Sequence, residues 1–232
     1  MIRVTRLAEG TRFAEARNRM VAEQIVARGV KDPLVLAAMR SVPRHEFVPN
    51  ELKDAAYRDS PLPIGDDQTI SQPYIVALMT EASGLEGGEK VLEVGTGSGY
   101  QSAVLDEIAG TVLTVEIMPT VAERARAGLD RLGYGDVRLR VGDGYRGWVE
   151  EGPFDVIVVT AAPDHVPRPL LDQLKPGGRL VLPVGRSRQK LQVWTKTDHG
   201  FEQRDLIPVS FVPMTGEARG EEAPDPNNAN QK

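Results

Sequence analysis

The stretch VLEVGTGSGYQSAVL, Val91–Leu105, determines which kind of fold this chain can adopt. A short run of strand-forming residues is followed by Gly95, Gly97 and Gly99 at alternate positions, and then by a helical pattern. Glycine permits positive φ and allows a ligand to approach the backbone closely. In an open parallel sheet, ligands bind beyond the carboxyl ends of the strands. This turn is therefore the expected floor of a binding site.

Strand-like and helix-like segments alternate around this turn. The runs that predict strands are 90–95, 111–117, 137–143, 154–161 and 178–185, and the helical patterns between them are 100–108, 119–132 and about 167–174. This alternation predicts a Rossmann-like, doubly wound α/β fold, in which a mostly parallel sheet carries helices on both faces. Two further strands are predicted at 190–197 and around 206–213, and Lys175–Gly178 is interpreted as a turn before the strand that follows it.

An N-terminal helical addition precedes the sheet. Gly29 lies where a helix would end, and Asp32-Pro33 is typical of the N-cap and first residue of the next helix, 34–40. A long polar loop follows from Asp59, and a further helix is predicted from about Pro73 to Ser83. The expected organisation is one domain, 1–215, with a helical and substrate-loop region at 10–84, a ligand-binding sheet core at 88–215 and a disordered tail at 216–232.

Composition limits the classes of function. The 232 residues are 41% hydrophobic and 26% charged, which suits a globular domain, and the net charge of −5 argues against a nucleic-acid-binding surface. There is no cysteine, and the three histidines are far apart, so a metal site is not expected. No signal-peptide pattern or long apolar run is present, and we expect a cytoplasmic protein with no membrane contact.

Acidic residues follow three successive strands and suggest the ligand. The glycine spacing is G-x-G-x-G rather than the dinucleotide pattern G-x-G-x-x-G, and it resembles the loop of S-adenosylmethionine-dependent methyltransferases, in which an acid such as Glu93 helps to hold the amino-acid part of the cofactor. Glu116 lies about 20 residues after the loop, where an acid that binds ribose hydroxyls belongs. Asp143-Gly144 could receive adenine. Alone, the glycine loop could be only a tight turn, Glu116 a solvated strand-end charge and Asp143 a turn residue. Together they favour a nucleoside cofactor.

The polar loop suggests the methyl acceptor. Thr69 and Ser71 offer hydroxyl donors before the N-terminus of a helix, an arrangement suited to a carboxylate. Ser71 could instead be a simple helix N-cap. No histidine lies in the glycine loop or in residues 59–81, and the fourth strand ends in Thr-Ala-Ala-Pro rather than the N/D-P-P-Y/F of many amino-group methyltransferases. Because an ionised carboxylate needs no general base, these absences favour an oxygen acid.

Several blocks together resemble the protein-L-isoaspartate O-methyltransferases: DSPLPIG with QTISQP (59–73), Arg28-Gly29-Val30, VPRHEFVP (42–49), LEVGTGSGY (92–100) and VPMT (212–215). The resemblance implies S-adenosylmethionine-dependent esterification of the α-carboxylate of L-isoaspartyl residues in damaged proteins and peptides, which starts repair through a succinimide. It implies Ser71 as the active-site residue and a monomer as the working state. The cofactor residues expected are Glu93, Gly95, Thr96, Gly97, Ser98, Gly99, Tyr100, Glu116, Ile117, Asp143, Gly144 and Thr215, and the substrate residues are Gln68, Thr69, Ile70, Ser71 and Val212.

Three alternatives remain open at this point. The first is a methyltransferase for a small acid or hydroxyl compound, against which the QTISQP block argues. The second is a catalytically silent module that binds a nucleotide-like ligand, which the intact acids and glycine loop disfavour. The third is an NAD-linked dehydrogenase, which the glycine spacing and the absence of a visible catalytic pair disfavour.

Overall fold

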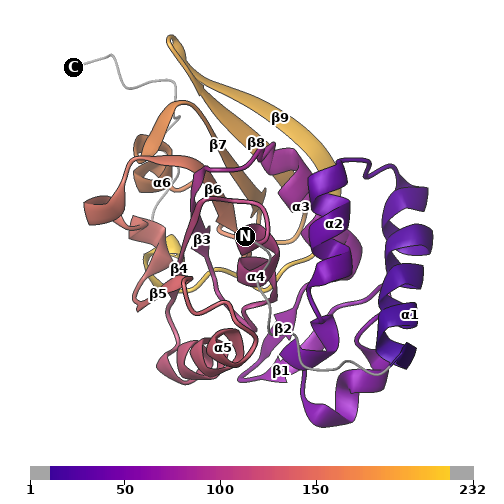
Figure 1. Ribbon diagram of the computed structural model, residues 1–232. Coiled ribbons are helices and arrows are strands. Elements are labelled where there is room, and N and C mark those ends of the chain that lie inside the picture. The colour runs from indigo at the N-terminus through magenta and orange to yellow at the C-terminus, as the bar shows by residue number, and fades with distance from the viewer. Residues whose placement is uncertain (1–10, 220–232) are drawn as a thin grey trace.

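The central element of the computed structural model, which describes residues 11–219, is a seven-stranded sheet in the order β5-β4-β3-β6-β7-β8-β9 (Figure 1). Neighbouring strands from β5 to β7 are parallel, whereas β8 and β9 are added antiparallel. The bounds are β3 Lys90–Val94, β4 Thr111–Glu116, β5 Arg138–Val141, β6 Phe154–Val159, β7 Leu174–Val184, β8 Gln189–Thr197 and β9 Gly200–Val209. The predicted, mostly parallel sheet is therefore confirmed.

Helices cover both faces of the sheet, and the side chains of each strand alternate between two apolar clusters. Val91 of β3 packs with residues of α3, α4 and α5, while Leu92 and Val94 pack on the other face with α6. This alternation follows from the two-residue repeat of a strand. The main helices are α1 Thr11–Met20, α2 Pro33–Ser41, α3 Pro73–Ser83, α4 Tyr100–Asp106, α5 Pro119–Arg131 and α6 Arg168–Asp172.

The N-terminal addition is helical, as predicted, and it packs outside α3 and α4 (Figure 1). Gly29 ends a short 3-10 helix with φ 94°, and Asp32 caps α2 by accepting hydrogen bonds from the Leu34 and Val35 amides at 2.8 and 3.2 Å. Both expected helix boundaries are thus confirmed. The remaining short helical segments here are Val21–Ile25, Val26–Arg28, Arg44–Phe47 and Asn50–Ala55.

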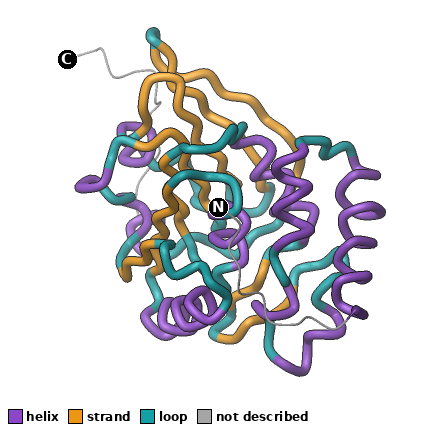
Figure 2. The backbone as a smooth tube through the Cα atoms, in the orientation of Figure 1, coloured by secondary structure: helices purple, strands orange, loops and turns teal. Residues whose placement is uncertain are grey.

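The polar loop is not purely irregular, which corrects the sequence-based interpretation. Within it, β1 (Leu62–Gly65) and β2 (Gln68–Ile70) form an antiparallel hairpin, visible as short strands beside α5 (Figure 2). Its turn residues Asp66 and Asp67 adopt positive φ, 52° and 55°, which suits a tight hairpin turn. The two strands have only four and three residues, and β1 contains Pro63, so they give no clear alternation and the pattern was missed.

Three other boundaries differ from the prediction. Lys175–Gly178 belongs to β7 as a bulge, because the register with β6 shifts there, and is not a turn before the strand. The last strand begins at Gly200, earlier than expected. The predicted tail starts too early: Gly216–Arg219 form a 3-10 helix, η7, in which Ala218 is buried, while residues 220–232 lie outside the described part.

No helix in residues 11–219 is both long and apolar enough to cross a membrane.

Candidate active site

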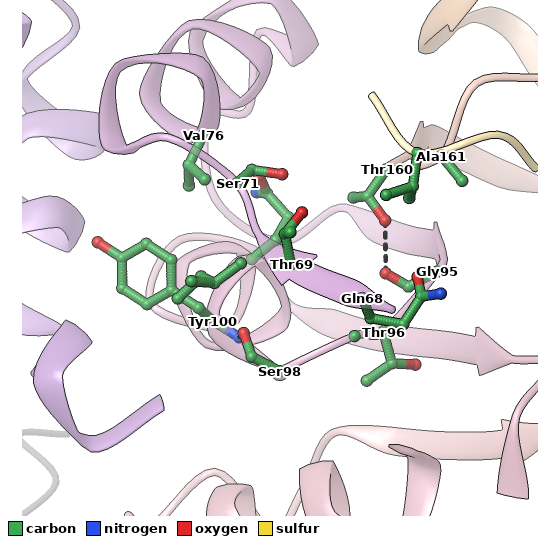
Figure 3. Close-up of a pocket in the computed structure, with 14 residues that line it drawn as sticks. Gln68, Thr69, Ser71, Val76, Gly95, Thr96, Ser98, Tyr100, Thr160 and Ala161 are labelled. Carbon is green, nitrogen blue, oxygen red and sulfur yellow. Dashed lines mark hydrogen bonds between the residues drawn. The ribbon is translucent and has the colours of Figure 1, made fainter. Parts of the chain in front are cut away.

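The glycine loop lies at the carboxyl end of β3 and is shaped by three positive φ angles. They are 94° at Gly95, 53° at Gly97 and 85° at Gly99. A Cβ atom on Gly95 would lie 2.5 Å from Oγ1 of Thr160, so close packing at this position also requires a residue without a side chain. The loop and the end of β6 line one side of a cavity (Figure 3).

Glu116 ends β4 beside this loop and is almost fully buried. Its carboxylate accepts hydrogen bonds from the Gly97 amide at 2.9 Å and the Met118 amide at 3.0 Å. Each carboxylate oxygen can accept more than one hydrogen bond, so capacity remains for two ribose hydroxyls. Together with Ile117, Glu116 lines a second cavity, and both cavities share Gln68, Gly95 and Ala161.

The segment after β9 closes the second cavity. Val212, Pro213, Met214 and Thr215 run past Ala162, which donates to the Val212 carbonyl at 2.9 Å and accepts from the Met214 amide at 2.7 Å. Gly144 lies opposite, and a Cβ there would come within 2.3 Å of Val94 Cγ1. Gly144 therefore has to lack a side chain so that it can pack against Val94 at the end of β3.

Three residues expected to touch the cofactor lie outside both cavities. Glu93 is fully buried under α4, where one carboxylate oxygen accepts from Ser102 and the other has no partner among the described residues. Asp143 accepts from the amides of Tyr145 and Glu217, both at 2.9 Å, and so anchors η7. Gly99 caps α4 against Leu129. Neither cavity is lined by these three residues.

Tyr100 borders the first cavity, but its ring is buried away from solvent. The centroid of the Tyr100 ring lies 5.6 Å from the centroid of the Phe47 ring and 4.8 Å from Cζ of Arg44. Burial raises the pKa of the Tyr100 hydroxyl to about 12. This tyrosine therefore stays neutral and joins α4 to the N-terminal helices, and it offers no base to the cavity.

The hairpin supplies the opposite wall. Gln68, Thr69, Ile70 and Ser71 line the first cavity, with Thr69 and Ser71 across from Thr160 and Ala161 (Figure 3). Ser71 does not cap α3, because the N-cap is Gln72 and no side-chain cap bond forms there. Within residues 11–219 its hydroxyl makes no hydrogen bond. The helix-cap alternative is therefore wrong, and the hydroxyl remains available to a ligand.

A third, wider groove opens from Thr69 and Ser71 towards solvent. One wall comes from the end of β9 and the residues after it, 207–212, and the other from the N-terminal helices and α3. Thr160 and Val212 also border this groove and the first cavity. The two cavities and the groove thus form a continuous site, and Ser71 lies where the first cavity meets the groove.

The lining suits S-adenosylmethionine. The acid at the end of β4 keeps free acceptor capacity, Gly144 lines the second cavity with it, and Gly95–Ser98 line the first, inner cavity beside Ser71. Sequence analysis missed Thr160, Ala161, Pro213 and Met214 as lining residues. Thr160 and Ala161 follow a parallel strand, which was the one available signal.

Comparison with known proteins gives the family. A sequence profile described as protein-L-isoaspartate(D-aspartate) O-methyltransferase matches residues 15–219. The chain belongs to this family. A protein-L-isoaspartate O-methyltransferase from a Picosynechococcus species is 57% identical over 204 residues, which cover 88% of this chain and 92% of the relative.

Solved structures agree with this assignment. One named protein-L-isoaspartate O-methyltransferase has a TM-score of 0.78 at 33% identity and covers 86% of this chain, while this chain covers 66% of it. Another, a putative family member from Plasmodium falciparum in complex with S-adenosyl-L-homocysteine, has a TM-score of 0.75 at 25% identity, with 86% of this chain and 98% of that chain covered. This protein is an S-adenosylmethionine-dependent protein-L-isoaspartate O-methyltransferase, and the dehydrogenase and silent-module alternatives are excluded.

Proposed function

We propose that the α-carboxylate of an L-isoaspartyl residue binds at the junction of the inner cavity and the outer groove, where Thr69 and Ser71 donate hydrogen bonds to it. The observation that carries this assignment is the Ser71 hydroxyl, which borders both spaces and has no partner among the described residues. An isoaspartyl residue lies within a peptide chain, so its site needs a groove open at both ends. A polar loop beside such a groove can bind the main chain while tolerating many side chains.

The chemistry asks little of the protein beyond alignment and exclusion of water. When bound, the cofactor supplies a methyl group on a sulfonium, which is a good leaving group. The acceptor carboxylate is already ionised near neutral pH, so no side chain has to remove a proton. We assign Gly95–Ser98 and Glu116 to the cofactor, with Ile117, Gly144 and Thr215 around its nucleoside end. The hairpin residues orient the acceptor towards the inner cavity.

The cofactor assignment predicts a binding defect. Glu116→Ala removes a carboxylate that would accept from ribose, and it also frees the Gly97 amide that it now orients. We expect the dissociation constant for S-adenosylhomocysteine, measured by calorimetry, to rise about tenfold to thirtyfold, as for the loss of a hydrogen bond to a charged group. Glu123→Ala, on the exposed face of α5, is the matched control and should bind as the wild type does. An unchanged constant in Glu116→Ala would remove Glu116 from the cofactor site.

We further propose that isoaspartyl proteins and peptides are the only macromolecular partners, that the enzyme acts as a monomer of one domain, and that it works in the cytoplasm. The net charge of −5 and the absence of cysteine support this view. Sedimentation at micromolar concentration tests the monomer.

The test of substrate class is transfer of labelled methyl to a synthetic peptide with one L-isoaspartate, compared with the same peptide carrying normal L-aspartate. We expect a base-labile methyl ester on the first peptide alone. Transfer to neither peptide, by a folded protein that binds the cofactor, would contradict the proposal and direct attention to small acids.

A further inference from the structure

Among the described residues that line the groove beside Ser71, a single one is charged. It is Arg28, and the others are neutral or apolar. The inner cavity is lined by no charged residue at all within the described part of the chain. The substrate's α-carboxylate is an anion, so the charge of the groove bears directly on how this carboxylate is bound.

Two contacts fix the position of the Arg28 guanidinium. Its Cζ lies 3.4 Å from the centroid of the Tyr74 ring, and Nη1 donates to Asp59 Oδ2 at 2.8 Å. Tyr74 is itself buried in the first turn of α3, two residues after Gln72. The Arg28 side chain nevertheless remains 43% exposed. A cation fixed in this way loses little conformational entropy when a ligand binds.

Asp59 forms the ion pair with Arg28 but does not itself line the groove. Among the described residues, the groove therefore presents the Arg28 guanidinium and not the Asp59 carboxylate to a bound peptide.

We propose that Arg28 is a positioning residue that attracts the ionised α-carboxylate of the substrate into the groove and towards Thr69 and Ser71. This inference rests on the proposed function of that groove. The attraction acts on the carboxylate before methyl transfer begins, and the ester that forms is neutral. Arg28 should therefore strengthen substrate binding without accelerating the chemical step, which affects KM and not kcat.

The same inference gives a role to sequence blocks that the cofactor site leaves unused. Arg28 comes from the Arg28-Gly29-Val30 block, and Asp59 begins the DSPLPIG block. The structure joins these two residues by an ion pair beside the groove that Arg28 lines.

The experiment pairs a protein charge with a substrate charge. Two peptides differ only in the α-group at the β-linked residue: isoaspartate carries a carboxylate and isoasparagine carries a neutral carboxamide. Their dissociation constants are measured calorimetrically with S-adenosylhomocysteine present, for the wild type, Arg28→Gln and Arg12→Gln. Arg12 is an exposed arginine of α1 outside the groove and is the matched control.

We expect the wild type and Arg12→Gln to bind the carboxylate peptide more tightly than the carboxamide. Arg28→Gln should lose about fivefold of this preference, as for a partly exposed charge pair of about 1 kcal/mol, and should keep the share that the Thr69 and Ser71 hydroxyls supply. In steady-state assays this variant should show KM for the isoaspartyl peptide raised about fivefold and kcat unchanged, and the salt dependence of kcat/KM should weaken.

Arg28→Lys separates charge from packing, since it keeps the cation but loses the planar contact with Tyr74. It should retain a preference for the carboxylate. Equal preference in Arg28→Gln and the wild type would overturn the proposal, and so would loss of preference in Arg28→Lys, which would show that Arg28 acts only by packing. Failure of the wild type to methylate the isoaspartyl peptide would instead contradict the proposed function, so the two failures are distinguishable.

Discussion

Ser71→Ala is expected to lower kcat/KM for an isoaspartyl peptide about a hundredfold, the upper part of the range for a hydrogen bond to a charged group. Ser71 lies where the inner cavity meets the groove, so its hydroxyl can bind the acceptor carboxylate beside the methyl donor. Since the hydroxyl caps no helix and has no partner among residues 11–219, its removal should leave the melting temperature within a degree or two of the wild type. Affinity for S-adenosylhomocysteine should change less than about twofold.

The measurement combines labelled-methyl kinetics, calorimetric cofactor binding and thermal unfolding on the same preparations. Ser187→Ala, in the exposed turn between β7 and β8, is the matched serine control and should behave as the wild type. Ser71→Thr keeps a hydroxyl and should recover part of the activity. A Ser71→Ala enzyme that is less stable but equally active per folded molecule would contradict the assignment and return Ser71 to a structural role.

Glu93 should make the stability of this enzyme fall as pH rises from about 5 to 8. Burial raises the pKa of its carboxyl to about 8 from an ordinary value of 4.5; hydrogen bonds from Ser102 and Thr114 oppose the rise, and the nearby charge of Glu116 adds to it. The folded state therefore keeps a proton that the unfolded chain releases above pH 4.5. The stabilisation is complete below the unfolded pKa and is lost through the folded pKa, with a total on the order of 3–5 kcal/mol.

Glu93→Gln replaces the carboxyl with a neutral group of the same shape and should remove this slope. Urea unfolding at pH 5, 6, 7, 8 and 9 gives the free energy of unfolding for both proteins, and the difference between them should shift in favour of the variant across that range. Glu86→Gln, which changes the same charge at an exposed position, should leave the pH profile unchanged. Parallel profiles for wild type and Glu93→Gln would show that Glu93 is ionised in the folded protein.

Local patterns in the chain predicted most of the sheet and its helices. The runs at Val91, Val112 and Val156 are buried strands because β-branched residues suit a sheet covered on both faces, and Asp32-Pro33 started a helix through cap chemistry that needs only neighbouring residues. The β1–β2 hairpin was missed because its few residues show no alternation, and its two turn residues with positive φ are aspartates rather than glycines.

The sequence predicted some residues of the candidate site correctly and could not predict the orientation of others. Gly95, Gly97, Glu116 and Gly144 were predicted from their positions after successive strands, because parallel strands bring their carboxyl ends to one edge whatever the side chains are. Sequence could not say which way an individual side chain points, and a shift of one residue along a strand reverses its face. Glu93 therefore lies under α4 instead of in the cavity, and Asp143 holds η7.

The positions of the strands along the chain, the glycine turn and the family blocks could be predicted from the sequence, because each depends on residues within a few positions of one another. The junction at Ser71 and the ion pair of Arg28 with Asp59 depend on contacts between segments far apart in the chain. Such contacts form only when the N-terminal helices, the hairpin and the end of β9 pack around the sheet. Packing buries Glu93 and so makes it a neutral acid. Packing also leaves Arg28 as the one cation among the described residues of the groove. Neither result could be predicted from a short segment, because desolvation and the placement of charges depend on the whole folded structure.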